Sequence, residues 1–150
     1  SPREAMALVE DGISAWPRES MAVIGSSLGG FYATAVAERC GCKAVVLNPS
    51  VEPARTLAGY IGEQSSWQDP EARFFFAPEF IDELRALQAG PLQAPQNYLA
   101  IIAKGDEVLD WREMTARYAG AQQCQLEGGD HALSNFEPHL ARIADFLALA

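Results

Sequence analysis

Four short segments of strand character alternate along the chain with segments of helical character. The strand-like segments are residues 21–25, 44–48, 98–103 and 122–127. The second and third are almost continuously apolar, which is typical of strands buried on both faces of a parallel sheet. Strands that alternate with helices favour a mostly parallel sheet covered by helices on both faces. The pattern therefore predicts an α/β fold.

The segments between the strands carry helix signals. Ser1-Pro2-Arg3-Glu4 combines a Ser N-cap, a Pro at the first helical position and a Glu three residues after the cap. A helix is therefore expected from here to about Ala15. Residues 31–40 are rich in Ala and have no interior Gly or Pro, so they predict a second helix. Further helices are expected over residues 53–60, 78–89, 111–119 and from 138 to the C-terminus.

The turn between the first strand and the second helix has the sequence Gly25-Ser26-Ser27-Leu28-Gly29. It fits the Gly-x-Ser-x-Gly nucleophile elbow, which needs a strand before it and a helix after it because the sharp turn lifts the Ser hydroxyl clear of the sheet. Both are predicted here, so Ser27 is the candidate nucleophile. Gly25 and Gly29 are expected where a side chain would clash with the turning backbone.

Other interpretations of this glycine-rich turn are weaker. A plain βα turn or an anion site at the helix N-terminus would use the same residue types. A dinucleotide-binding turn requires Gly at the position held by Ser27, so this motif is not matched. A P-loop ends in Gly-Lys-Ser/Thr, and no Lys lies near this turn in the sequence.

A serine nucleophile needs a base, and the chain has two histidines. His131 follows Gly128-Gly129-Asp130 just after a predicted strand, and active sites of open parallel sheets gather at that edge. His139 stands beside Pro138 at a helix start, where a surface position is expected. His131 is therefore the candidate base.

The third member of a triad orients the imidazole and stabilises its charged form. The loop after the third strand offers three carboxylates, Asp106, Glu107 and Asp110. Asp106 is favoured because it comes first after the turn. Asp110 is the runner-up and could instead cap the next helix, while Glu107 is interpreted as a solvated charge. The chain order Ser, Asp, His is that of α/β-hydrolases.

Composition narrows the function classes. The chain has 150 residues, is 49% hydrophobic and 21% charged, and carries a net charge of -9. This charge argues against nucleic-acid and anionic-membrane partners, which ask for basic patches. No apolar run approaches a membrane span or a signal peptide. The three cysteines form no disulfide framework or zinc motif, which favours reduced thiols in the cytoplasm.

Together the motifs resemble the YqiA-like esterases, a compact branch of the α/β-hydrolases. The segments that carry the resemblance are residues 23–34, 46–50, 105–110 and 127–132, and it extends over nearly the whole chain. The resemblance implies an α/β-hydrolase fold and hydrolysis of carboxylic esters without a metal or an organic cofactor. It places the nucleophile at Ser27, the acid at Asp106 and the base at His131.

The chain departs from this family at its start. Members begin with a strand and a His-Gly-type loop that supplies part of the oxyanion hole, whereas here a helix signal stands at Ser1. One oxyanion donor is expected from the backbone N–H of Leu28, the residue after the nucleophile. The second donor and the strand beside the elbow strand are expected from a missing segment, so we expect an N-terminally truncated domain with an exposed strand edge.

Substrate contacts are expected from five further positions. Residues 62–96 lie where α/β-hydrolases carry their cap, so Trp67 and Phe75 are candidates for an acyl pocket, although a core position would suit the Phe run as well. Phe136 is a candidate wall, and Ser26 and Asn48 are candidates for the pocket floor. The expected substrate is a small-molecule ester with a small to medium acyl group.

Rival functions are an acyl-CoA thioesterase with the same triad, a non-catalytic hydrolase-like binding module and a nucleotide-binding βα domain. The first would need a basic patch for the phosphates, which the acidic composition disfavours. The second fits the missing oxyanion segment but not the triad candidates.

Overall fold

The computed structural model describes residues 1–65, 69 and 71–149. The chain divides into two compact units. The smaller contains Ser1–Ser14 and Glu52–Gln88, and the larger contains Ala15–Val51 and Ala89–Ala150.

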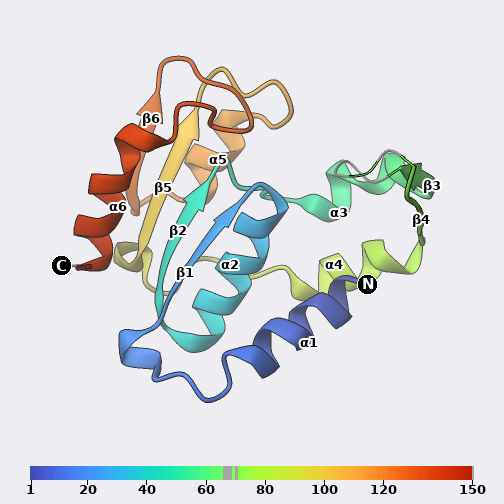
Figure 1. The fold of residues 1–150 in the computed structure, drawn as a ribbon, viewed down its shortest axis with the longest axis horizontal. Coiled ribbons are helices and arrows are strands. Elements are labelled where there is room, and N and C mark those ends of the chain that lie inside the picture. Colours follow the sequence, from blue (N-terminus) through green and yellow to red (C-terminus); the bar gives the residue numbers. More distant parts are fainter. Residues whose placement is uncertain (66–68, 70, 150) are drawn as a thin grey trace. The chain divides into compact units, whose positions relative to one another are not determined.

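The larger unit is built on a four-stranded parallel sheet. Its strands lie in the order β1 (Ala22–Ser26), β2 (Lys43–Leu47), β5 (Tyr98–Ala103) and β6 (Gln122–Leu126). All neighbouring pairs are parallel, so the four carboxyl ends share one edge (Figure 1). This sheet confirms the predicted fold class. Strand β1 is an end strand, paired with β2 alone among the described residues.

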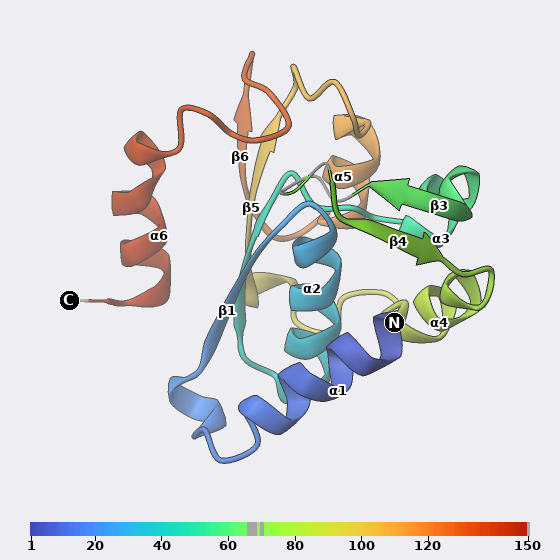
Figure 2. The same cartoon turned by 45° about the vertical axis from the view of Figure 1, so that its right-hand side comes forward.

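Helices lie on both faces of this sheet. Figure 2 shows α2 (Leu28–Cys40) and α5 (Trp111–Arg117) on one side and α6 (Leu140–Leu147) on the other. Short 3-10 turns precede three of the elements, at Arg18–Ser20, Pro95–Asn97 and Glu137–His139. None of the helices in the described ranges combines the length and apolar character needed to cross a bilayer.

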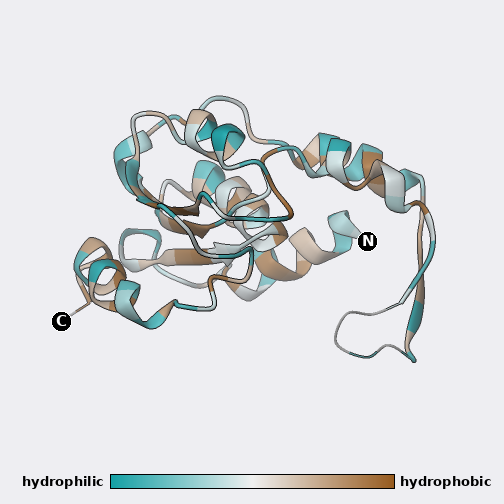
Figure 3. Ribbon diagram, turned by 90° about the horizontal axis from the view of Figure 1, so that it is seen from above, coloured by the Kyte–Doolittle hydropathy of each residue, from teal (hydrophilic) through white to brown (hydrophobic). Residues whose placement is uncertain are grey.

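The core of the larger unit lies on the two central strands. Val45, Leu99 and Ile101 have no exposed surface, and α6 adds Ile143 to the same cluster. Burial of one such side chain stabilises the fold by about 1.5–3 kcal/mol. In Figure 3 the hydrophobic colouring of this unit is concentrated in its strands. The continuous apolar runs of β2 and β5 follow from this burial on both faces.

The smaller unit begins with α1 (Pro2–Gly12). The predicted capping box is present, because the Ser1 hydroxyl accepts from the N–H of Glu4 and the Glu4 side chain accepts from the Ser1 backbone nitrogen. This helix contacts α4 (Glu79–Leu87), where Glu83 accepts a hydrogen bond from the N–H of Arg3 at 2.9 Å. The unit also contains α3 (Pro53–Thr56) and a 3-10 turn, Ala58–Tyr60, in place of the single helix expected over 53–60.

An antiparallel hairpin completes the smaller unit. Its strands are β3 (Gly62–Ser65) and β4 (Arg73–Phe76), and Glu63 pairs with Phe75 in its register. The sequence did not predict this hairpin, because Gly-Glu-Gln-Ser lacks both the apolar alternation and the β-branched residues of a strand. Of the cap-like segment expected over 62–96, the part up to residue 88 belongs to this unit and the rest to the larger one.

Candidate active site

Ser27 stands at the turn between β1 and α2, in a backbone conformation that side chains rarely adopt. Its φ is 53° and its ψ is -123°, a region that glycine occupies far more readily. Its N–H donates to the carbonyl of Leu47 at 3.0 Å, and its own carbonyl accepts from the N–H groups of Gly30 and Ser50, both at 2.9 Å. A strained residue held by its surroundings is a frequent feature of functional sites.

Two glycines make the turn possible. A Cβ on Gly25 would lie 2.1 Å from the carbonyl oxygen of Gly29, and a Cβ on Gly30 would lie 2.7 Å from the Cβ of Pro49. The clash expected at Gly29 is wrong, because a Cβ there would meet no neighbouring atom within 4 Å. Helix α2 turns the Gly29 side-chain position outward and directs that of Gly30 at the neighbouring loop.

The loops after β5 and β6 approach each other closely. The Lys104 N–H donates to the Leu126 carbonyl at 2.9 Å, and the Gly105 N–H donates to the Gly128 carbonyl at 3.3 Å. A Cβ on Gly105 would lie 2.3 Å from the carbonyl oxygen of Gly129. Only glycine fits at position 105, and this close approach places Asp106 beside His131.

The structure brings Ser27, His131 and Asp106 into one hydrogen-bonded chain. The Nε2 atom of His131 lies 2.8 Å from the Ser27 hydroxyl oxygen, and its Nδ1 atom lies 2.8 Å from the Asp106 Oδ2. The Asp106 side chain has no exposed surface, whereas that of His131 is 21% exposed. All three residues follow carboxyl ends of strands, which is why they meet at one edge of the sheet.

The Asp106 carboxylate is fixed by further hydrogen bonds. Its Oδ1 accepts from the N–H groups of Val108 and Leu109, both at 2.8 Å. Asp110, the alternative acid, lies elsewhere: it caps α5 by accepting from the N–H of Arg112 at 2.9 Å, and its side chain is 48% exposed. Asp106 is therefore the carboxylate that the fold presents to the imidazole.

The first residue of α2 offers a hydrogen-bond donor beside the nucleophile. Leu28 begins the helix directly after Ser27. The N–H groups of a helix's first turn have no partner within the helix, and the helix dipole adds partial positive charge there. This N–H can therefore stabilise negative charge that develops next to the Ser27 hydroxyl.

The loop that carries His131 contains a turn that is stabilised by a hydrogen bond between Asp130 and Ser134. The carboxylate of Asp130 accepts from the backbone N–H of Ser134 at 2.9 Å. Hydrogen bonding from Ser134, first from its side chain and then from its backbone, lowers the pKa of Asp130. The charged Asp130 side chain thus stabilises the turn of residues 130–134, which contains His131. His139 lies further on, in the 3-10 turn Glu137–His139.

The five expected substrate contacts have different surroundings. Asn48 has no exposed surface and its amide is engaged by the protein, so it has no face to offer a substrate. Phe136 is partly buried and packs against the core cluster of the larger unit. Ser26 is an exposed residue of β1, Phe75 is 59% exposed on β4 of the smaller unit, and Trp67 lies outside the described residues.

Two residues that contact the main chain around His131 were assigned other roles from the sequence. Asn48 was expected in the pocket floor and Glu107 in solvent, yet both hydrogen-bond to this loop. A clue was the position of Asn48 directly after β2 and of Glu107 on the loop after β5, both at the edge of the sheet where the site forms. Within the described ranges, no group of three or more His, Cys, Asp or Glu side chains is arranged to hold a metal ion.

Comparison with known proteins gives this site a family context. Residues 1–148 match the family described as "Uncharacterised protein family (UPF0227)". The chain belongs to the UPF0227 family. A UPF0227 protein of Serratia proteamaculans (strain 568) is 27% identical over 130 residues, which are 85% of this chain and 64% of that protein. One of Vibrio parahaemolyticus is 31% identical over 88 residues, 59% of this chain and 42% of that protein. The chain thus spans less than two thirds of these relatives.

Solved structures described as hydrolases or as a lipase share the fold of this chain. The α/β hydrolase domain-containing protein 10 from mouse superposes with a TM-score of 0.69 at 15% identity, over 99% of this chain and 70% of that one. A monoacylglycerol lipase of Paleococcus ferrophilus gives 0.68 at 16% identity, over 100% and 76%. A putative hydrolase of Agrobacterium vitis S4 gives 0.65 at 17% identity, over 97% and 67%. The resemblance to the α/β-hydrolases is confirmed at the level of fold.

Proposed function

We propose that this chain is a serine hydrolase that cleaves small to medium carboxylic esters through an acyl-enzyme. The observation that carries the proposal is the unbroken hydrogen-bonded chain from the Ser27 hydroxyl through His131 to the buried Asp106. The descriptions of the structural neighbours, which name a lipase and a hydrolase, support it.

The first half-reaction transfers the acyl group to the protein. Nε2 of His131 accepts the Ser27 proton as the hydroxyl oxygen attacks the ester carbonyl carbon. A tetrahedral intermediate forms, and its oxyanion accepts a hydrogen bond from the N–H of Leu28. As the carbon–oxygen bond to the alcohol breaks, the imidazolium returns the proton to the leaving alkoxide. Asp106 stabilises the imidazolium in between.

The second half-reaction releases the acid. His131 takes a proton from a water molecule whose oxygen attacks the acyl carbon, and the imidazolium then protonates Ser27 as the ester bond to it breaks. Throughout, the hydrogen bonds from the N–H groups of Val108 and Leu109 to the Oδ1 of Asp106 keep this carboxylate oriented. These steps consume water and use the side chains of Ser27, His131 and Asp106 together with the backbone N–H of Leu28. A second oxyanion donor from a preceding loop stays a prediction.

We assign the substrate to the esters, with acyl-CoA thioesters as the rival class. Phosphate groups of CoA call for unpaired cations near the site. Lys104, on the loop that carries Asp106, pairs with Glu127, and Arg112, in the first turn of α5, pairs with Asp110. The thiols of Cys40, Cys42 and Cys124 are free, which is compatible with a reducing compartment, and we place the activity in the cytoplasm.

The test combines a fluorophosphonate probe with a short-chain chromogenic ester. Both report an activated serine, because the probe reacts covalently with the same nucleophile that attacks the ester. Parent chain is compared with Ser27→Ala and His131→Asn. The matched controls are Ser20→Ala, at an exposed serine before β1, and His139→Asn, at the other histidine.

Labelling and turnover are expected in the parent and both controls, and are expected to vanish in Ser27→Ala and His131→Asn. Labelling without ester turnover would keep the serine hydrolase and move the substrate to another acyl class, beginning with acyl-CoA. A parent chain that neither labels nor turns over, while folded by circular dichroism, would favour the non-catalytic binding module.

A further inference from the structure

The peptide bond that precedes His131 is held from both of its ends by side chains of two other loops. Its N–H, on His131, donates to Oε2 of Glu107 at 3.0 Å. Its carbonyl, on Asp130, accepts from Nδ2 of Asn48 at 2.9 Å. The N–H and the C=O of a trans peptide point in opposite directions, so the two side chains grip this peptide from opposite sides.

We propose that Glu107 is a positioning residue of the active site, acting together with Asn48 on the main chain of His131. The proposal rests on the function proposed above, because it concerns the geometry of that imidazole. His131 lies in a loop without regular secondary structure, and a catalytic group needs to be held within about 0.5 Å of its working geometry. The two hydrogen bonds to its peptide, which we call the clamp, restrain the backbone of His131 as the hydrogen bonds of a helix or strand would.

Asn48 is the fixed side of this clamp. It is fully buried directly after β2, with a φ of 39° that Asn tolerates better than most residues. Its Oδ1 accepts from the Ala103 N–H at 2.8 Å, and its Nδ2 also donates to the His131 carbonyl at 3.1 Å. The side chain thereby ties the ends of β2 and β5 to the loop that carries the imidazole.

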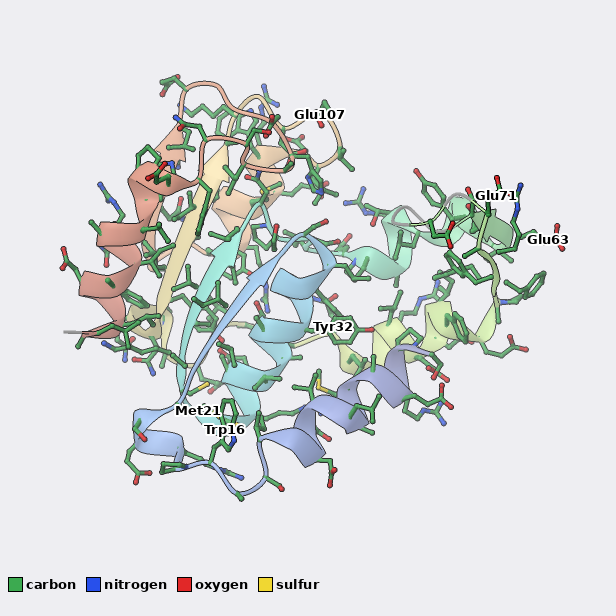
Figure 4. The ribbon with its side chains drawn as sticks, viewed as in Figure 1. Trp16, Met21, Tyr32, Glu63, Glu71 and Glu107 are labelled. Carbon is green, nitrogen blue, oxygen red and sulfur yellow. The ribbon has the colours of Figure 1, made fainter. Side chains whose placement is uncertain are left out.

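Glu107 is the outer side of the clamp. Figure 4 labels it on the loop after β5, next in sequence to Asp106. Adjacent residues of one loop therefore hold the ring and the main chain of His131: Asp106 binds Nδ1, and Glu107 binds the backbone N–H. A rotation of the imidazole away from Ser27 would have to break the contact with Asp106, and a shift of the His131 main chain would have to break the contact with Glu107. Glu107 needs no contact with substrate to affect the rate.

The exposure of Glu107 makes the proposal testable without unfolding the protein. Asn48→Ala would also remove the buried bond to the Ala103 N–H, so a loss of activity there would be mixed with a loss of stability. Glu107 lies at the surface, where removal of a side chain has a small effect on the free energy of unfolding. The variants are Glu107→Ala, which deletes the acceptor, and Glu107→Gln, which keeps an acceptor oxygen but removes the charge.

Glu127→Ala is the matched control. It also deletes one exposed carboxylate near the site, but this carboxylate binds Lys104 and not the His131 loop. We expect kcat to fall about tenfold in Glu107→Ala with KM unchanged, since displacement of a catalytic group slows the chemical step. Glu107→Gln is expected within about threefold of the parent and Glu127→Ala at the parent rate. Equal losses in Glu107→Ala and Glu107→Gln, or no loss in Glu107→Ala, would overturn the proposal.

A second measurement does not depend on catalysis. In a His139→Asn background His131 is the single histidine, so its ring signals in nuclear magnetic resonance spectra are unambiguous. We expect the Nδ1 proton, held by Asp106, to be observed in the parent and in Glu107→Gln and to broaden or disappear in Glu107→Ala. An unchanged signal in Glu107→Ala would refute the clamp even if the chain hydrolyses esters. A lost signal would support it even if the chain hydrolyses none.

Discussion

The backbone N–H of Ser27 donates a hydrogen bond of 3.0 Å to the carbonyl of Leu47, the last residue of the neighbouring strand β2. The bond continues the pairing of β1 with β2 one residue past the end of β1. Together with the bond from the Ser50 N–H to the Ser27 carbonyl at 2.9 Å, it holds the serine in a conformation that its own side chain disfavours. The sheet edge therefore stabilises the strained turn.

Relief of this strain should be measurable. Residues in such backbone regions cost about 1–3 kcal/mol, and glycine avoids this cost while losing about 0.5–1 kcal/mol through its greater freedom when unfolded. Ser27→Gly is therefore expected to be about 1 kcal/mol more stable than Ser27→Ala in urea unfolding. Both variants should lack hydrolase activity. Equal stability of the two would show that the turn stores no strain.

The two glycines of the elbow should respond differently to a methyl group. Gly25→Ala would force a Cβ against the Gly29 carbonyl, and we expect a loss of about 3 kcal/mol in the free energy of unfolding. Gly29→Ala meets open space and replaces glycine within α2, so we expect no loss, or a gain of up to about 1 kcal/mol. Chemical denaturation of both variants compares them directly. A similar loss in both would contradict the open space at Gly29, and no loss in Gly25→Ala would contradict the close contact at Gly25.

Substitution of the two aspartates on the loop after β5, Asp106 and Asp110, should have different effects on kcat. Asp106→Asn keeps an acceptor for the loop N–H groups but removes the charge that stabilises the imidazolium, so kcat is expected to fall by about 10³–10⁴. Asp110→Asn is the control, because Asn caps helices as well as Asp does. Its activity and melting temperature should match the parent. A large loss of rate in Asp110→Asn alone would exchange the roles of the two residues.

Stability at alkaline pH should depend on two buried tyrosines of the larger unit. Burial raises the pKa of Tyr98, helped by its hydroxyl bond to Glu38, and burial also raises the pKa of Tyr118. In the unfolded chain tyrosines ionise near pH 10. Above this pH the unfolded state releases protons that the folded state keeps. The contribution of the two tyrosines to the free energy of unfolding is therefore fully present below about pH 10 and falls as the pH rises further.

Urea unfolding between pH 8 and pH 11 checks this expectation. Tyr98→Phe loses the bond to Glu38 at every pH, so it should be less stable than the parent at pH 8. Its stability should nevertheless fall less between pH 8 and pH 11, because one of the two ionisations is gone. A pH dependence as steep as that of the parent would argue that Tyr98 does not contribute.

The strands of the larger unit could be predicted because each has a local signature. The continuous apolar run of β5 is the direct consequence of burial on both faces, and the structure places it at the same residues, Tyr98–Ala103. The capping box at Ser1 is equally local, and it is present. The hairpin of β3 and β4 has no such signature, since polar Glu63 becomes part of a strand only through its pairing with Phe75.

The candidate site divides in the same way. Ser27, Asp106 and His131 could be singled out because each follows a predicted strand and belongs to a residue type with the right chemistry. The roles of Asn48 and Glu107 could not, since their partners lie 82 and 24 positions away in the sequence. An amide or a carboxylate is polar in any context, and burial and partners decide its role.

The sequence by itself determined the order of the elements, the glycine-rich turn that carries Ser27 and the residue types available for chemistry, because these depend on contacts between near neighbours. Tertiary structure decided which carboxylate meets the imidazole. Asp106 and Asp110 share one loop, and the approach of Gly105 to Gly129 turns the first toward His131 while the second caps α5. That choice depends on how two loops pack at the sheet edge. Packing between segments that are distant in the sequence depends on both segments, so it cannot be predicted from the local sequence of either one.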